Sequence, residues 1–187
     1  MKFRVIGLAM IALVSACSGV TREQLVQKER TDCALSPIKF TVDVRPARDG
    51  DCEWALFQGD SPNAYGYEEF YRYAEDDRGF IKALYLKASR NSHLNWYDAQ
   101  TVANRQWSAM KRADAWHDAA SIETADHKFD IASFRLPKDR ACTAFVSYWQ
   151  PSVHGFDRML SGYFCGGTES HGRADQLAVL SSIKIEE

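Results

Sequence analysis

Alternating apolar and polar residues predict several strands along this chain. Phe40, Val42 and Val44 alternate with polar residues until Pro46, and residues 53–57 form a second apolar stretch. A period of two is typical of a half-buried strand, because successive side chains point to opposite faces of a sheet. Further strands are expected near the end of the chain, at residues 129–136, 142–149 and 159–165, with residues 151–157 as a loop.

Apolar residues spaced three or four apart predict helices. The aromatic stretch at residues 67–76 is interpreted as a short helix that Gly79 ends, and residues 80–88 fit either a strand or a second helix. Residues 98–116 fit a longer helix, for which Asp98 is a plausible N-cap. A closing amphipathic helix is expected from about residue 173.

The order of these elements predicts the fold class. Strands come in pairs and triplets, and helices stand between and after them, which favours an α+β fold. We expect a single domain with an antiparallel sheet, helices packed on the sheet, and disulfides. The domain is expected to span residues 33–187, because residues 18–32 are polar and contain few large apolar side chains.

The first residues have the layout of a secretory signal. Lys2 and Arg4 are followed by residues 5–14, which contain neither a charge nor a proline, and then by Ser15, Ala16 and Cys17. A charged start, a short apolar core and a small-residue exit are typical of a signal peptide, and a core this short does not span a bilayer comfortably.

Residues 14–17, Val-Ser-Ala-Cys, resemble the lipobox of bacterial lipoproteins. The resemblance implies a leader at residues 1–16, acylation of Cys17, and a lipidated tether at residues 17–32. Ser18, where lipoproteins of the inner membrane often carry Asp, favours the outer membrane. The implied partner is a lipid bilayer, because several acyl chains on one cysteine hold firmly. The alternative is an ordinary cleaved signal that a cysteine happens to follow.

Charge excludes one class of partner. The leader holds two of the 23 basic residues and none of the 25 acidic ones, so the mature chain has a net charge near −4. This balance argues against a nucleic acid as partner, because nucleic-acid binding needs a positive surface.

Four cysteines remain after Cys17, and an even number in an exported protein predicts two disulfides. Three pairings are possible, and we favour the two that close short local loops, Cys33–Cys52 and Cys142–Cys165. In an antiparallel hairpin with 142 opposite 165, the pairs 144–163, 146–161 and 148–159 share a face with the second bridge. No C-x-x-C spacing occurs, so we expect no zinc site, and no cofactor motif is present.

Histidines and carboxylates provide only weak candidates for catalysis. Glu123 and His127 would share a face if they lay on a helix and could then act as metal ligands, but we favour a solvated helix end and loop. His154 stands between Ser152 and Asp157, and Ser170 precedes His171, but no G-x-S-x-G motif presents a serine. His117 completes the set of weak candidates.

An aromatic stretch is the best candidate for binding. Tyr65, Tyr67, Phe70, Tyr71 and Tyr73 offer a large contact area and hydroxyl groups, suited to a protein partner or to the sugar rings of the cell wall. The alternative is that Tyr67, Phe70, Tyr71 and Ala74 form the buried stripe of one helix.

Three hypotheses for function follow. The first is a non-enzymatic binding or interaction module, lipid-anchored in the cell envelope and facing the periplasm from the outer membrane. The second is a small periplasmic hydrolase, with or without a metal ion, that uses His117, His127, His154 or His171. The third is a purely structural role without a ligand.

Overall fold

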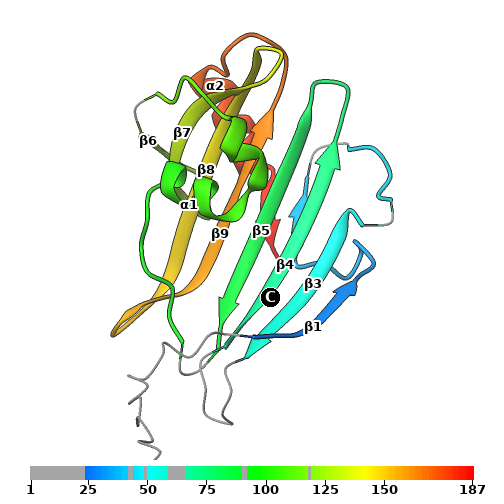
Figure 1. Ribbon diagram of the computed structural model, residues 1–187, viewed down its shortest axis with the longest axis vertical. Coiled ribbons are helices and arrows are strands. Elements are labelled where there is room, and N and C mark those ends of the chain that lie inside the picture. The colour runs from blue at the N-terminus through cyan, green and yellow to red at the C-terminus, as the bar shows by residue number, and fades with distance from the viewer. Residues whose placement is uncertain (1–23, 42–43, 49, 59–65, 90–91, 118) are drawn as a thin grey trace, which may run out of the picture.

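The protein is built around one large antiparallel sheet (Figure 1). This computed structural model describes residues 24–41, 44–48, 50–58, 66–89, 92–117 and 119–187. Within them, eight strands pair in the order β1-β3-β4-β5-β9-β8-β7-β6, and β10 pairs with β2 in a second sheet. The strands are β1 (Gln24–Arg30), β2 (Ile38–Phe40), β3 (Cys52–Gln58), β4 (Gly66–Glu75), β5 (Phe80–Ala88), β6 (Ala120–Glu123), β7 (Lys128–Leu136), β8 (Arg140–Ser152), β9 (Gly155–Cys165) and β10 (Ile183–Ile185). The helical segments are α1 (Ala99–Gln106), the 3₁₀ turn η1 (Ser108–Arg112) and α2 (Arg173–Ser181).

The fold is mainly β, so the expectation of an α+β class is wrong. Strands account for 51% and helical segments for 15% of the structure. The helix expected at residues 67–76 is not a helix, and the one expected at residues 98–116 is shorter than predicted. The molecule therefore consists mainly of antiparallel sheet, and its two short helices do not form a layer of their own.

The expected helix at residues 67–76 is strand β4. It pairs with β3 on one side and β5 on the other, with Tyr71 opposite both Glu53 and Leu84. Both faces of this inner strand pack against other residues, so its apolar residues do not alternate simply and imitate a helical spacing. Tyrosine and phenylalanine also favour strands, and the pairing on both sides allows that preference to prevail. The ambiguous residues 80–88 likewise form a strand, β5.

The hairpin of β8 and β9 has the expected register. Cys142 lies opposite Cys165, and the pairs 144–163, 146–161 and 148–159 follow. The disulfide between the two cysteines joins Cα atoms 4.1 Å apart, and the other favoured bridge, Cys33–Cys52, is also present. The expected loop at residues 151–157 is wrong, since the strands continue to Ser152 and from Gly155 and leave a two-residue turn.

The N-terminal half contains two strands that differ from the expectations. Residues 24–30 lie within the expected tether but form the edge strand β1, paired with β3, so the domain begins before Cys33. The strand expected at residues 40–45 is shorter and earlier: β2 ends at Phe40 and pairs with β10, while Val44 is irregular and Val42 lies outside the described residues.

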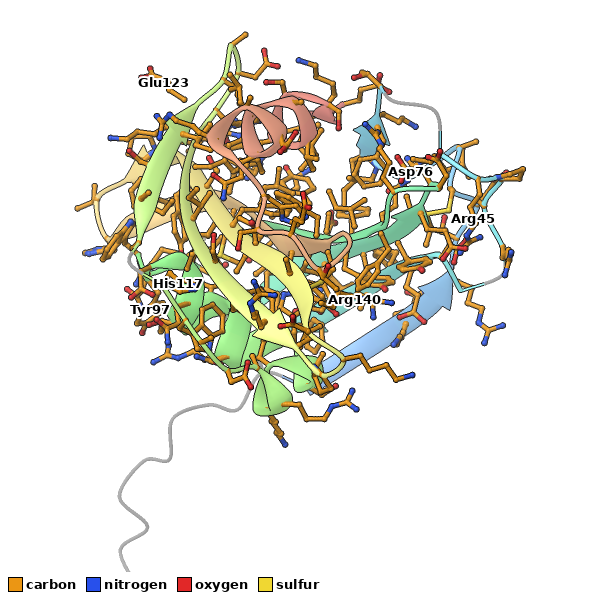
Figure 2. All side chains as sticks on the ribbon, turned by 90° about the horizontal axis from the view of Figure 1, so that it is seen from above. Arg45, Asp76, Tyr97, His117, Glu123 and Arg140 are labelled. Carbon is orange, nitrogen blue, oxygen red and sulfur yellow. A yellow bond between two sulfur atoms is a disulfide. The ribbon has the colours of Figure 1, made fainter. Side chains whose placement is uncertain are left out.

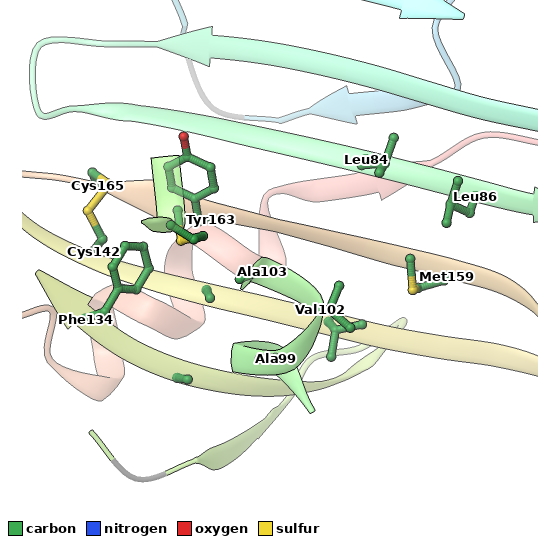
Figure 3. Close-up of a cluster of buried hydrophobic side chains, with 14 residues drawn as sticks. Leu84, Leu86, Ala99, Val102, Ala103, Phe134, Cys142, Met159, Tyr163 and Cys165 are labelled. Carbon is green, nitrogen blue, oxygen red and sulfur yellow. A yellow bond between two sulfur atoms is a disulfide. The ribbon is translucent and has the colours of Figure 1, made fainter. Parts of the chain in front are cut away.

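The two faces of the sheet carry separate apolar clusters. On one face, α1 lies over the strands β7, β8 and β9, with Ala99, Val102 and Ala103 in the same cluster as Met159 and Tyr163 (Figure 3). Asp98 caps this helix as expected, because its carboxylate accepts a hydrogen bond from the Thr101 amide at 2.8 Å. The helix ends at Gln106, well before residue 116, because Trp107 has an extended backbone.

The opposite face is covered by α2, β2 and β10. The closing helix begins at Arg173, as expected, and buries Leu180. Ile38 of β2 and Ile183 of β10 join the same cluster as Tyr85, Phe145 and Leu160. This second layer covers only part of the sheet face, and a cavity remains at its margin.

Candidate ligand-binding site

A cavity of about 360 Å³ lies between α2 and the turn that joins β4 to β5. Its size is within the range of sites for small molecules. The cavity is bounded by β2 and the following residues, by the ends of β4, β5 and β9, by residues 166–171 and by α2.

The floor of the cavity is apolar, and the sheet register creates it. Ala74 of β4 lies opposite Ile81 of β5, which lies opposite Phe164 of β9. These three residues, here called the floor row, are neighbours across three strands and therefore point to the same face. Phe40 and Val179 add apolar walls from β2 and α2.

One rim of the cavity is a tightly bonded turn. The Asp76 carboxylate accepts hydrogen bonds from the backbone amides of Arg78 and Gly79 at 2.9 and 3.0 Å, and it pairs with the Arg78 guanidinium at 2.8 Å. Burial acts to raise the pKa of Asp76, but these hydrogen bonds outweigh it and hold the pKa below its usual value. The turn is therefore held by an ionised aspartate.

The opposite rim carries a histidine held by a buried polar network. His171 Nδ1 lies 3.2 Å from the hydroxyl of Thr143, which is fully buried in β8. The Gln176 side-chain amide donates to Thr143 Oγ1 at 3.4 Å and to Ser133 Oγ at 3.3 Å. This network fixes α2 and the histidine ring relative to the sheet.

The environment of His171 favours its neutral form. Burial lowers the pKa of the imidazole, and the nearby carboxylate of Asp175 opposes this only in part. Nε2 lies against Gly166, where an added Cβ would come within 2.8 Å of it, and both residues line the cavity. The site can therefore offer an apolar floor and one neutral imidazole to a bound molecule.

The aromatic candidates do not form a single binding face. Alternation along β4 places Tyr67, Tyr71 and Tyr73 on the face that carries α1, whereas Phe70 lies on the other face and stacks on Tyr85 with ring centroids 5.8 Å apart. The ring of Tyr71 packs against that of Trp107, with ring centroids 5.9 Å apart. Tyr65 lies outside the described residues. The alternative interpretation, the buried stripe of one helix, is wrong because the segment is a strand.

The weak catalytic candidates lie in different parts of the molecule. His117 is exposed beside β7, His127 packs against Trp149 with ring centroids 4.6 Å apart, and His154 occupies the β8–β9 turn. Glu123 ends a strand and shares no helix with His127, and Figure 2 shows Glu123 well separated from His117. The described residues include no group of three or more His, Cys, Asp or Glu side chains that could hold a metal ion.

Sequence reasoning missed the cavity. Two of the residues that line it, Ser170 and His171, were considered for chemistry, but as parts of a hydrolase and not as a ligand site. The floor row joins three separate strands, so no local pattern could identify it. Alternation within each strand indicated which residues share a face, but only the pairing of the strands brings them together.

Comparisons of the chain with protein-family models, with curated proteins and with solved structures found no match. In the part of the chain that the structure describes, no helix has both the length and the apolar character needed to cross a membrane. Cys17 lies outside the described residues.

Proposed function

We propose that this protein is a lipid-anchored binding module of the bacterial cell envelope. Its ligand is a small molecule with an apolar body and one hydrogen-bonding group. The observation that carries the proposal is the cavity beside α2, with the apolar floor row below and the neutral His171 at the rim. The signal layout and the lipobox-like residues 14–17 support the anchor.

The chemistry of the cavity favours binding over catalysis. The hydroxyl that contacts His171 belongs to Thr143, which is fully buried and out of reach of a ligand. The hydroxyl of Ser182, another cavity residue, donates to the Val179 carbonyl at 2.6 Å. Neither group is placed as a nucleophile that His171 could activate.

A substitution that fills the cavity tests the proposal. Ala178 lines the cavity from α2, whereas Ala174 is exposed on the same helix outside the lining. The full chain is purified from membranes as wild type, Ala178→Trp and Ala174→Trp, and the small molecules that copurify are extracted and identified by mass spectrometry. We expect at least one compound in the wild type and in Ala174→Trp that falls at least fivefold in Ala178→Trp.

Two results would count against a binding module. Identical extracts from all three proteins would remove the cavity as a ligand site. Stoichiometric zinc in protein purified without chelator would instead support the metal-dependent hydrolase.

A further inference from the structure

One end of the domain, here called the hairpin end, is formed by residues 150–156 and 92–97. The first segment is the tip of the β8–β9 hairpin. The second is fastened to it: Leu94 and Phe156 exchange backbone hydrogen bonds of 2.7 and 3.0 Å. Further along, the Tyr97 amide donates to the Tyr148 hydroxyl at 3.1 Å. Trp96 therefore belongs to a segment that is held to the hairpin at both ends.

The hairpin end exposes apolar side chains. Val153 is 92% exposed and Trp96 is 57% exposed. They are two of only four large apolar side chains that are exposed among the described residues, the others being Leu35 and Leu177. In membrane proteins, tryptophan is enriched at the boundary between water and lipid.

The two segments of the hairpin end contain no acidic residue, although the chain has 25 Asp and Glu residues. The opposite end of the sheet carries them at its turns and in the segment after β9, with Asp76, Asp77, Asp139 and Glu169. Two carboxylates, Asp98 and Asp157, directly follow these segments, so acidic residues are fewer at this end than at the opposite one. A surface with few carboxylates suits contact with anionic headgroups, which repel negative charge.

The described chain begins at this same end of the domain. Gln24 begins β1 opposite Gln58, and Gln58 lies opposite Gly66 at the start of β4. The Ser89 amide donates to the Gly66 carbonyl, so these residues mark the end of the sheet where β5 stops and the hairpin tip lies (Figure 1). Only residues 18–23 separate Gln24 from Cys17, and such a segment spans at most about 25 Å.

We propose that the hairpin end rests on the lipid surface, with Trp96 and Val153 in the headgroup region. The inference rests on the acylation of Cys17 in the proposed function and adds an orientation to it. The cavity is built around the β4–β5 turn and residues 166–171, at the opposite end of the sheet. It therefore faces away from the membrane that holds the protein.

The test uses tryptophan quenching in the full-length lipoprotein. The protein is reconstituted into phosphatidylcholine vesicles whose acyl chains are brominated near the headgroup, and flotation together with the intact mass of the Cys17 peptide reports the anchor. In a Trp96→Phe background, Val153→Trp places a probe at the hairpin end. Leu35→Trp places a matched probe on another exposed position, 78% exposed, near the Cys33–Cys52 bridge at the other end of β3.

We expect the added tryptophan at 153 to be quenched at least threefold more than the one at 35, and wild type to lose more emission than Trp96→Phe. Equal quenching at 153 and 35 in protein that is acylated and floats would overturn the orientation and leave the anchor intact. An unacylated Cys17 would overturn the anchor and, with it, the orientation.

Discussion

Phe145 lies directly opposite Gly162 in the β8–β9 ladder, and its ring occupies the space above the glycine. A Cβ placed on Gly162 would lie 2.7 Å from Phe145 Cζ and 2.0 Å from the Lys82 carbonyl oxygen of β5. The absence of a side chain at 162 therefore allows β5 to pair closely with β9. It also allows the Phe145 ring to join the apolar cluster that contains Leu160 and Leu180.

Gly162→Ala should strongly destabilise the protein. Both the backbone of β5 and a fully buried ring would have to move, and overpacking of this kind costs about 3 kcal/mol. Gly167→Ala is the control, because nothing lies within 4 Å of a Cβ at that position. Chemical denaturation of the two variants measures the difference, and equal stability would contradict the packing described here.

Replacement of Cys142 and Cys165 together by Ala should lower the free energy of unfolding by about 2–4 kcal/mol. The bridge links two adjacent strands with a sequence separation of 23, and its loss frees the hairpin in the unfolded chain. Denaturation of the double variant measures the loss. A non-reducing peptide map of the wild type that joins Cys142 to any other cysteine would disprove the register.

The free energy of unfolding should fall as pH drops below about 6.5, the usual pKa of histidine. Burial lowers the pKa of His171 and of His127 in the folded state, so in this range the unfolded chain binds more protons than the folded one. Above that pH both histidines are neutral in the folded and in the unfolded state, so their contribution to the free energy of unfolding no longer changes with pH.

Single variants separate the two histidines. His171→Gln and His127→Gln should each make the decline below pH 6.5 shallower, and the double variant should make it shallower still. Denaturation at a series of pH values measures this. Profiles that keep the wild-type slope in both variants would show that neither ring is protonated more readily in the unfolded chain.

Cys17→Ser should release the protein from the membrane fraction. In the proposed anchor the acyl chains are attached to this thiol, and none of the helices that the structure describes is long and apolar enough to span a membrane. Fractionation of cells that express the variant, beside wild type labelled with an alkynyl fatty acid, measures the change. Retention of Cys17→Ser in the membrane would contradict the anchor.

Local patterns in the sequence predicted several features correctly. The register of β8 and β9 followed from two cysteines in neighbouring strands, and Asp98 was identified as a cap from its place before the helix. The beginning of α2 and the strands β3, β5 and β7 also fit their patterns, with β5 left as one of two alternatives. Each of these depends on residues close together in the chain or on a single covalent link.

Long-range pairing decided the rest. By itself the sequence indicated the β8–β9 hairpin, its bridge and the Asp98 cap, because their interactions are local. Only the tertiary structure made residues 66–75 a strand, since pairing with both β3 and β5 outweighs a helical spacing of apolar residues. It also placed Ala74, Ile81 and Phe164 in one row and thereby formed the cavity, because residues on different strands become neighbours only when the strands pair.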